Sequence, residues 1–205
     1  MNIFYLDYDT KKCAEQHNDK HVVKMILEYA QLLSTAHRIL DGTPSVVLSN
    51  KGRRKTVHTL PDHRDVLLYS ATHANHPSAI WVRQSDKNYD WLFSLFQELM
   101  SEYTYRYGKV HASSRLEIAL SRLPSNIPQA EFTGPTPAMP DEYKVYGNSI
   151  ESYHNYYIGS KHEMSRWTNR PMPEWFAEGI NKKYDHDCYI FMKNNRTIST
   201  STMHL

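Results

Sequence analysis

The stretch AEQHNDKHVVKMILEYAQLLSTAHRILDG, residues 14–42, predicts the principal helix of the fold, from about Ala14 to Leu40. Its apolar residues recur at three- and four-residue intervals, as in an amphipathic helix, and Asp41–Gly42 is a typical helix stop. On a helical wheel of 100° per residue, the polar residues fall within roughly 80° of arc. This polar strip comprises His17, His21, Lys24, Glu28, Gln31 and Thr35.

The narrow polar strip has two interpretations. A solvated helix face usually covers half of the circumference or more, so a thin strip on an otherwise apolar helix indicates the wall of a cleft. Alternatively, it is only the exposed face of a core helix, with Lys24 and Glu28 as an ordinary i,i+4 ion pair. In a cleft, a carboxylate beside a lysine and histidines would be suited to proton transfer.

The rest of the chain predicts further helices and one hairpin around this helix. SVVLS and KTVHTL flank Asn50–Arg53 within residues 45–60, as in a β-hairpin. The run LPSNIPQAEFTGPTPAMP, residues 123–140, is too rich in proline to be helical and predicts a long surface loop. Asn148 and Glu151 fit a capping box that opens another helix. Helices are expected at about 61–72, 87–107 and 149–167, an extended segment at 2–6, and a short turn at 174–176.

These elements predict a mainly α, compact single-domain fold at residues 1–184, with a small β-hairpin, a long Pro-rich loop and a polar tail at 185–205. Of the 205 residues, 40% are hydrophobic and 22% are charged, which is typical of a folded globular protein. The sequence contains no apolar run long enough to span a membrane and no secretory signal. Cys13 and Cys188 are two thiols in a chain with a sizeable core, which favours a reducing cytoplasm, the host's if the protein is viral, and no disulfide framework. Neither belongs to a CxxC pair, which argues against a cysteine zinc site.

The net charge of +2 excludes a strongly basic footprint for the whole chain, so any nucleic-acid surface must be local. Three clusters are rich in cations and able to hold phosphates, and in two of them aromatic rings able to stack bases lie between the cations. They are Lys51–Lys55, Tyr103–Lys109 and Lys161–Trp175. Helix-end packing and solvated cations explain each cluster equally well. The candidate nucleic-acid-binding residues are Arg53, Arg54, Lys55, Trp81, Arg83, Tyr105, Arg106, Lys109, Arg166, Trp167 and Arg170.

A metal is the alternative use of the histidines. His17 and His21 are spaced i,i+4 and are weak candidate ligands, but HNDKH is not the HExxH signature. The further ligands available to such a site would be Asp7, Asp9, His73 and His76. The sequence therefore predicts no metal and no other cofactor, while a His-based metal-dependent hydrolase stays open as an alternative function.

Four short stretches have counterparts in a known family. They are MNIFYLD at residues 1–7, EYAQLL at 28–33, HPSAIW at 76–81 and RPMPEW at 170–175. In these stretches the chain resembles the pyrimidine-dimer DNA glycosylases, small helical enzymes of the phage endonuclease V type. The resemblance implies a compact helical domain. It also implies a free terminal α-amine that attacks the sugar C1′ and a glutamate on the first long helix that assists.

The family's glutamate has no direct counterpart in this chain. Matching EY places it on Gln31, whereas matching AEQH places it on Lys24. Glu28, one turn before Gln31, is then the available carboxylate, and without it the excision chemistry would be lost. Bulky Asn2 predicts that Met1 is retained, so the nucleophile would be the amine of Met1 or of Lys24. An α-amine suits this role because it keeps a useful neutral fraction near pH 7.

The sequence thus predicts a phage DNA-binding enzyme that acts on a flipped-out base, a DNA glycosylase and lyase of base-excision repair. Its partner would be double-stranded DNA carrying damaged or modified bases, and it would be a monomer or weak dimer without a membrane partner. The alternative is a catalytically altered binder or modifier of viral DNA bases. The predicted catalytic residues are Met1, His21 as a proton carrier, Lys24, Glu28 and Gln31.

Overall fold

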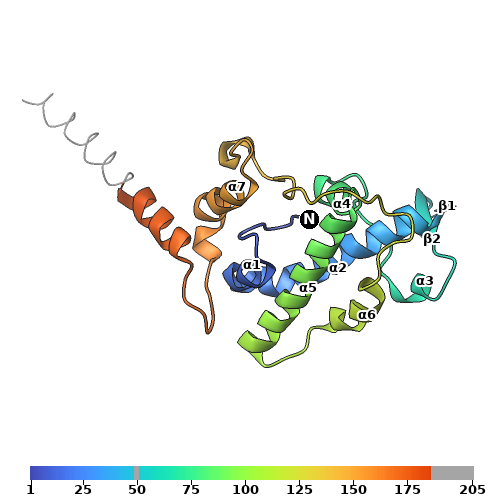
Figure 1. Ribbon diagram of the computed structural model, residues 1–205, viewed down its shortest axis with the longest axis horizontal. Coiled ribbons are helices and arrows are strands. Elements are labelled where there is room, and N and C mark those ends of the chain that lie inside the picture. Colours follow the sequence, from blue (N-terminus) through green and yellow to red (C-terminus); the bar gives the residue numbers. More distant parts are fainter. Residues whose placement is uncertain (49–50, 186–205) are drawn as a thin grey trace, which may run out of the picture.

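A computed structural model of the chain describes residues 1–48 and 51–185 (Figure 1). These residues form a mainly α fold, and their strands make one antiparallel pair. The predicted fold class is therefore confirmed. The predicted polar tail lies, apart from Asp185, outside the described residues.

Two long helices form the centre of the molecule. Helix α2 (Asp19–Asp41) packs against α5 (Asp86–Tyr107), which crosses it in Figure 1 and also packs against α1 (Thr10–Gln16). Leu92, Phe96 and Leu99 form the apolar stripe that α5 buries. Helix α5 ends where Gly108 adopts a left-handed conformation with φ of 63°, as the sequence predicts.

The predicted single helix from Ala14 to Leu40 is wrong at its beginning, because the chain breaks between α1 and α2. The backbone N–H of His17 turns back to the carbonyl of Ala14 and closes α1. The side chain of Asn18 accepts a hydrogen bond from the backbone N–H of His21 at 2.9 Å and so opens α2. A short amide side chain that binds its own backbone favours such a cap over a helix interior. His17 therefore lies outside the polar strip of α2.

The helix predicted at 61–72 is also wrong, since only α3 (Arg64–Leu67) forms there. The guanidinium of Arg38 reaches across from α2 and binds the carbonyl oxygens of Asp65, Leu68 and Tyr69 at 2.6–2.9 Å. Those carbonyls then satisfy their hydrogen bonds without a continuing helix.

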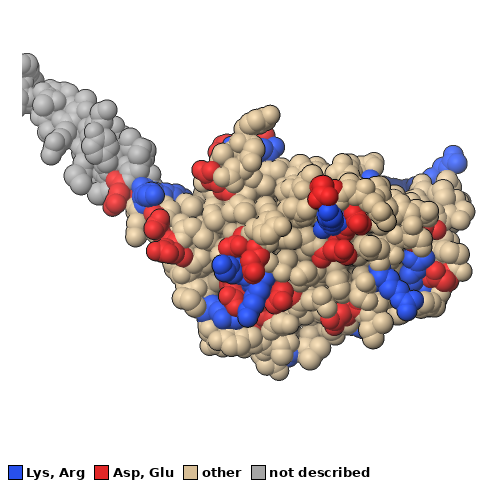
Figure 2. Space-filling model, viewed as in Figure 1, with Lys and Arg blue, Asp and Glu red and all other residues tan. Residues whose placement is uncertain are grey.

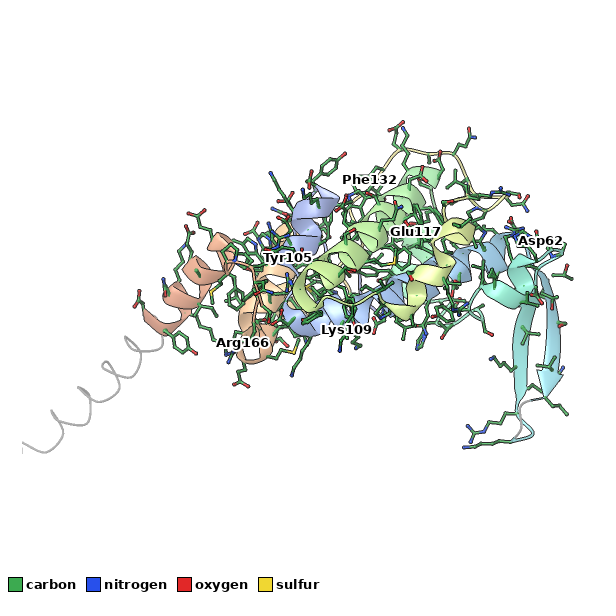
Figure 3. All side chains as sticks on the ribbon, turned by 90° about the horizontal axis from the view of Figure 1, so that it is seen from below. Asp62, Tyr105, Lys109, Glu117, Phe132 and Arg166 are labelled. Atoms are coloured by element: carbon green, nitrogen blue, oxygen red, sulfur yellow. The ribbon has the colours of Figure 1, made fainter. Side chains whose placement is uncertain are left out.

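The hairpin appears where the sequence predicts it. Strands β1 (Thr43–Leu48) and β2 (Arg54–Thr59) pair antiparallel, with Thr43 opposite Thr59 and Leu48 opposite Arg54. The hairpin follows directly from the end of α2 and projects beyond the helical body (Figure 3).

The remaining elements complete the layer around the central helices. The predicted helix start at Asn148 is confirmed, because its side chain accepts a hydrogen bond from the backbone N–H of Glu151 in the first turn of α7 (Ser149–Tyr156). The second bond of a capping box is not formed: Glu151 accepts from the side chain of Asn148, while the backbone N–H of Asn148 donates to the carbonyl of Val145. Residues 123–140 contain no helix or strand, as expected for the Pro-rich loop. No helix in residues 1–48 or 51–185 is long and apolar enough to cross a membrane. The elements around the two central helices are α4 (Pro77–Val82), η1 (Ala112–Leu116), α6 (Glu117–Leu120), η2 (Asp141–Tyr143), α7 (Ser149–Tyr156), η3 (Tyr157–Lys161), η4 (His162–Met164) and a helix at 174–185.

Candidate active site at the amino terminus

Lys24 and Glu28 lie one turn apart on the exposed side of α2. The Lys24 Nζ is 3.1 Å from the Glu28 Oε1, so the two side chains form an i,i+4 ion pair. The side chain of Glu28 is 14% exposed, whereas that of Lys24 is 68% exposed. Helix α2 thus places a mostly buried carboxylate at the border between the core and the solvent.

The amino group of Met1 lies near the other oxygen of the same carboxylate. Its nitrogen lies 4.0 Å from the Glu28 Oε2, and the Met1 side chain is 5% exposed. This distance is that of an ion pair and exceeds that of a hydrogen bond. Glu28 therefore lies between two amines, one from the first residue and one from its own helix.

Residues 3–6 hold the first residue in place because all four are buried in the core. The backbone N–H of Phe4 donates a hydrogen bond to the Tyr29 hydroxyl at 3.2 Å. The ring of Phe4 stacks on that of His21, with 4.0 Å between the centroids. Residues 2–6, predicted as an extended segment, make no strand and act as a buried anchor.

Two histidines before α4 complete the cluster. His76 caps α4, since its Nδ1 accepts a hydrogen bond from the backbone N–H of Ser78 at 3.2 Å. Burial, the Met1 amino group and His73 lower the pKa of His76, while Glu28 acts in the opposite direction. His76 is therefore mainly neutral at pH 7 and electrostatically coupled to both charges. We call this group the amino-terminal cluster: the Met1 amine, Lys24, Glu28, His73 and His76.

The other members of the predicted strip are placed differently. Gln31 is half-buried one turn beyond Glu28, and Thr35 is buried, with its hydroxyl 3.4 Å from the carbonyl oxygen of Thr72. His21 cannot serve as a proton carrier, because its Nδ1 lies 2.5 Å from the Tyr157 hydroxyl inside the core. Burial lowers the pKa of His21 to about 2.

The alternative metal site on the weak candidates His17 and His21 finds no support in the positions of these side chains. Both ring nitrogens of His17 are engaged, Nδ1 with the carbonyl of Cys13 at 2.7 Å and Nε2 with the Tyr29 hydroxyl at 2.9 Å. Within the described part of the chain, no group of three or more His, Cys, Asp or Glu side chains could hold a metal ion.

Two arginines predicted to hold phosphates are internal ion-pair partners. Arg106 has a fully buried side chain that contacts Glu102 at 2.6 Å and Asp19 at 2.8 Å. Arg170 binds the same Glu102 at 2.9 Å and Glu15 at 3.2 Å. Because these charges are already neutralised inside the protein, Arg106 is excluded as a phosphate ligand and Arg170 is a poor one.

Two tryptophans predicted to contact a base are structural as well. The indole of Trp81 is buried and donates to the carbonyl of Thr133 at 2.9 Å, which ties the Pro-rich loop to α4. Trp167 is 9% exposed and donates to the carbonyl of Gln16. Arg83 donates to the carbonyls of Ala74 and Ala79. These three side chains fix loops and helix ends.

The remaining candidates are on the surface. Tyr105 is 56% exposed with Arg170 over its ring, and Lys109 and Arg166 are exposed along the lower border of the body in Figure 3. The hairpin cations Arg53, Arg54 and Lys55 are exposed. In Figure 3 the two strands lie at the opposite end of the molecule from the orange-red helix at 174–185. Figure 2 shows blue and red side chains intermingled on one face of the molecule, so this face carries no continuous basic surface.

Sequence reasoning missed Glu102 and the part played by His76. The i,i+4 spacing of Glu102 and Arg106 was a usable signal for the first, since such pairs are neighbours on a helix. His76 was considered only as a metal ligand, and nothing local in HPSAIW indicates that it lies beside the Met1 amine. Comparisons with protein-family models, with curated proteins and with solved structures each found no match.

Proposed function

We propose that this chain is a DNA-binding enzyme that removes a flipped-out base through an amine nucleophile, with Glu28 as the assisting carboxylate. The observation that carries this proposal is the position of Glu28 between the Met1 amine at 4.0 Å and the Lys24 amine at 3.1 Å. The resemblance to the pyrimidine-dimer glycosylases, which use a terminal amine and a glutamate, supports the same chemistry.

In the proposed reaction, the neutral amine nitrogen forms a bond to the sugar C1′ as the bond from C1′ to the base breaks. The base leaves with that electron pair and takes up a proton. The sugar ring then opens to a protonated imine joined to the protein. Glu28 would accept the proton from the attacking amine and return one to the sugar oxygen, which is ordinary general acid–base work for a carboxylate.

The Met1 amine is the better candidate nucleophile, because the buried residues after it hold it in place. Lys24 is the second candidate. Its side chain is 68% exposed and carries a strongly hydrated ammonium group on a flexible stem, so it loses more conformational entropy when it attacks. His76, kept mainly neutral by burial and the nearby amine, could accept a proton from either group.

Borohydride trapping tests the proposal directly, because it reduces an imine between protein and DNA to a stable bond. We expect the wild-type protein to form a covalent adduct with duplex DNA that contains an abasic site. Glu28→Gln should slow adduct formation about 10²- to 10⁴-fold, the usual contribution of a general acid–base group. Glu131→Gln is the matched control, since Glu131 forms an exposed lysine pair with Lys87 and should leave the rate unchanged.

Peptide mapping of the adduct and two further variants distinguish the amines. Adding one residue before Met1 moves the amine by about 3.8 Å and should abolish trapping if Met1 attacks. Lys24→Gln should abolish it if Lys24 attacks. The absence of an adduct on every abasic or damaged duplex, under conditions where the protein binds that DNA, would contradict the proposed excision chemistry.

A further inference from the structure

The β1–β2 hairpin is a ribbon that the protein leaves uncovered. Val46, Val47 and Leu48 are 56%, 41% and 71% exposed. Successive side chains of a strand point to opposite faces, so exposure of both Val46 and Val47 shows that neither face is packed against the helical body. An isolated two-stranded hairpin is marginally stable in water, which indicates a surface completed by a partner.

The base of the hairpin is fixed to the body, unlike its far end. Arg38 of α2 donates to the carbonyl of His58 at 2.8 Å and binds Asp65 at 2.8 Å. Leu60, just after β2, is buried. The hairpin therefore starts from a rigid support at the end of α2 and extends away from it (Figure 3).

The charge of the hairpin is of one sign. Between Gly42 and Leu60 the sequence contains no Asp or Glu, whereas Lys51, Arg53, Arg54 and Lys55 gather near its far end. The neighbouring acids Asp62 and Asp65 lie after the hairpin and are already paired with Arg64 and Arg38. A basic, acid-free ribbon complements a polyanion.

The dimensions of the hairpin fit the major groove of duplex DNA. Six residues per strand extend about 20 Å, while the groove is about 12 Å wide and 8.5 Å deep and admits a two-stranded ribbon. The apolar side chains of β1 could contact base edges such as thymine methyl groups, and the cations near the far end could contact phosphates.

The hairpin is also placed at a defined distance from the amino-terminal cluster. Glu28 and Asp41 are thirteen residues apart on α2, so the base of the hairpin lies about 20 Å along the helix from the carboxylate. Val23, Lys24 and Leu27 of α2, in the turns before and beside Glu28, are exposed. In Figure 3 the hairpin projects from the Asp41 end of α2, beyond the helical body.

We propose that the β1–β2 hairpin enters the major groove of duplex DNA about six base pairs from the nucleotide held at the amino-terminal cluster. The spacing follows from 20 Å at about 3.4 Å per base pair. The hairpin would then be the main anchor of the protein on undamaged flanking DNA. The placement relative to the nucleotide rests on the proposed function, whereas the groove contact itself does not.

The test measures binding of the full chain to a duplex that contains a tetrahydrofuran abasic analogue, which binds without reacting. Arg54→Gln with Lys55→Gln should weaken binding at least tenfold on a duplex with ten base pairs on each side. It should also reduce the slope of log K against log salt by about 1.8, the value for two lost phosphate contacts. The matched control is Lys87→Gln with Lys144→Gln, which removes two cations held in exposed pairs with Glu131 and Asp141.

Shortening the duplex on one side of the abasic analogue shows where along the DNA the hairpin makes its contact. With the analogue three base pairs from one end of the duplex, the wild type should lose affinity in one of the two orientations, and the hairpin variant should then bind no more weakly than the wild type. An unchanged slope, equal effects in hairpin and control variants, preference for RNA, or a hairpin that instead pairs with another protein strand would each overturn the proposal. If groove contact is observed but no borohydride adduct forms, the proposed excision fails while the groove contact stands.

Discussion

Glu102 shows how a residue that resembles a surface charge becomes part of the core. Its carboxylate is 3% exposed and accepts hydrogen bonds from both Arg106 and Arg170. These bonds join α5 to the segment after η4, in which Arg170 lies. Two of the cations predicted to bind DNA, Arg106 and Arg170, thus stabilise the fold, because a buried carboxylate needs opposite charges around it.

Glu102→Gln should reduce the free energy of unfolding by about 3–5 kcal/mol, since it leaves the buried guanidinium of Arg106 with one fewer counter-charge. Urea denaturation measures the change. The double variant Glu102→Leu with Arg106→Met should be less destabilised than the single variant, because it removes both charges. A single variant within 1 kcal/mol of the wild type would show that the pair is not structurally important.

At the scale of elements, local capping sets the helix boundaries. Asn18 divides the predicted first helix in two, and Gly108 ends α5 with a left-handed residue. The break at Asn18 turns the chain so that α1 and α2 both contact α5. Without it, the buried segment before α1 could not run back along α2 to bring Met1 beside Glu28.

Gly108→Ala should lower the free energy of unfolding by about 1 kcal/mol, the cost of a Cβ in the left-handed region. No atom lies within 4 Å of the position a Cβ would occupy, so the cost comes from the backbone alone. Gly108→Asn should cost less, since asparagine tolerates this conformation. Equal stability of all three proteins in urea would contradict the assigned cap.

At the scale of the whole molecule, three histidines are enclosed as neutral groups. His17 lies between α1 and α2, His21 lies in the first turn of α2, and His37 lies near its end against the Tyr89 hydroxyl at 2.8 Å. Burial is the main cause that lowers the pKa to about 4 for His17 and His37 and to about 2 for His21. The core therefore resists protonation of the histidines near both ends of α2.

The free energy of unfolding should fall as the pH drops from about 6.5 toward 4. In this window the unfolded chain binds protons at these histidines and the folded chain does not, so stability rises with pH and is fully present above about 7.5. Each histidine lowers the free energy of unfolding by up to about 1.4 kcal/mol for each pH unit within this window. Urea titrations at pH 7.5, 6 and 5 measure the slope.

In the variant His37→Gln, the free energy of unfolding should change less between pH 6 and pH 5 than in the wild type. The difference should be at most the contribution of one histidine, about 1.4 kcal/mol per pH unit. His63→Gln, at an exposed position outside the amino-terminal cluster, is the control and should keep the wild-type slope. The same free energy of unfolding at pH 7.5 and pH 5 would show that the histidines are accessible to protons in the folded state.

The sequence by itself determined the fold class, α5, the hairpin and the pairing of Lys24 with Glu28. These features rest on periodicity, caps and turns, which act over a few residues and can be recognised in a short stretch. It also limited the candidate carboxylate to Glu28 within the predicted polar strip, although the family resemblance placed the glutamate at Gln31 or Lys24.

Only the tertiary structure decided which charged residues are internal and what lies beside the Met1 amine. Arg106 and Arg54 are equally basic in the sequence, but Arg106 is enclosed by α5, α1 and Asp19, whereas Arg54 stands on an open ribbon. The Met1 amine meets Glu28 because residues 3–6 bury their side chains against α2. Burial depends on contacts between segments that are distant in the chain, and local sequence patterns do not predict which distant segments pack together.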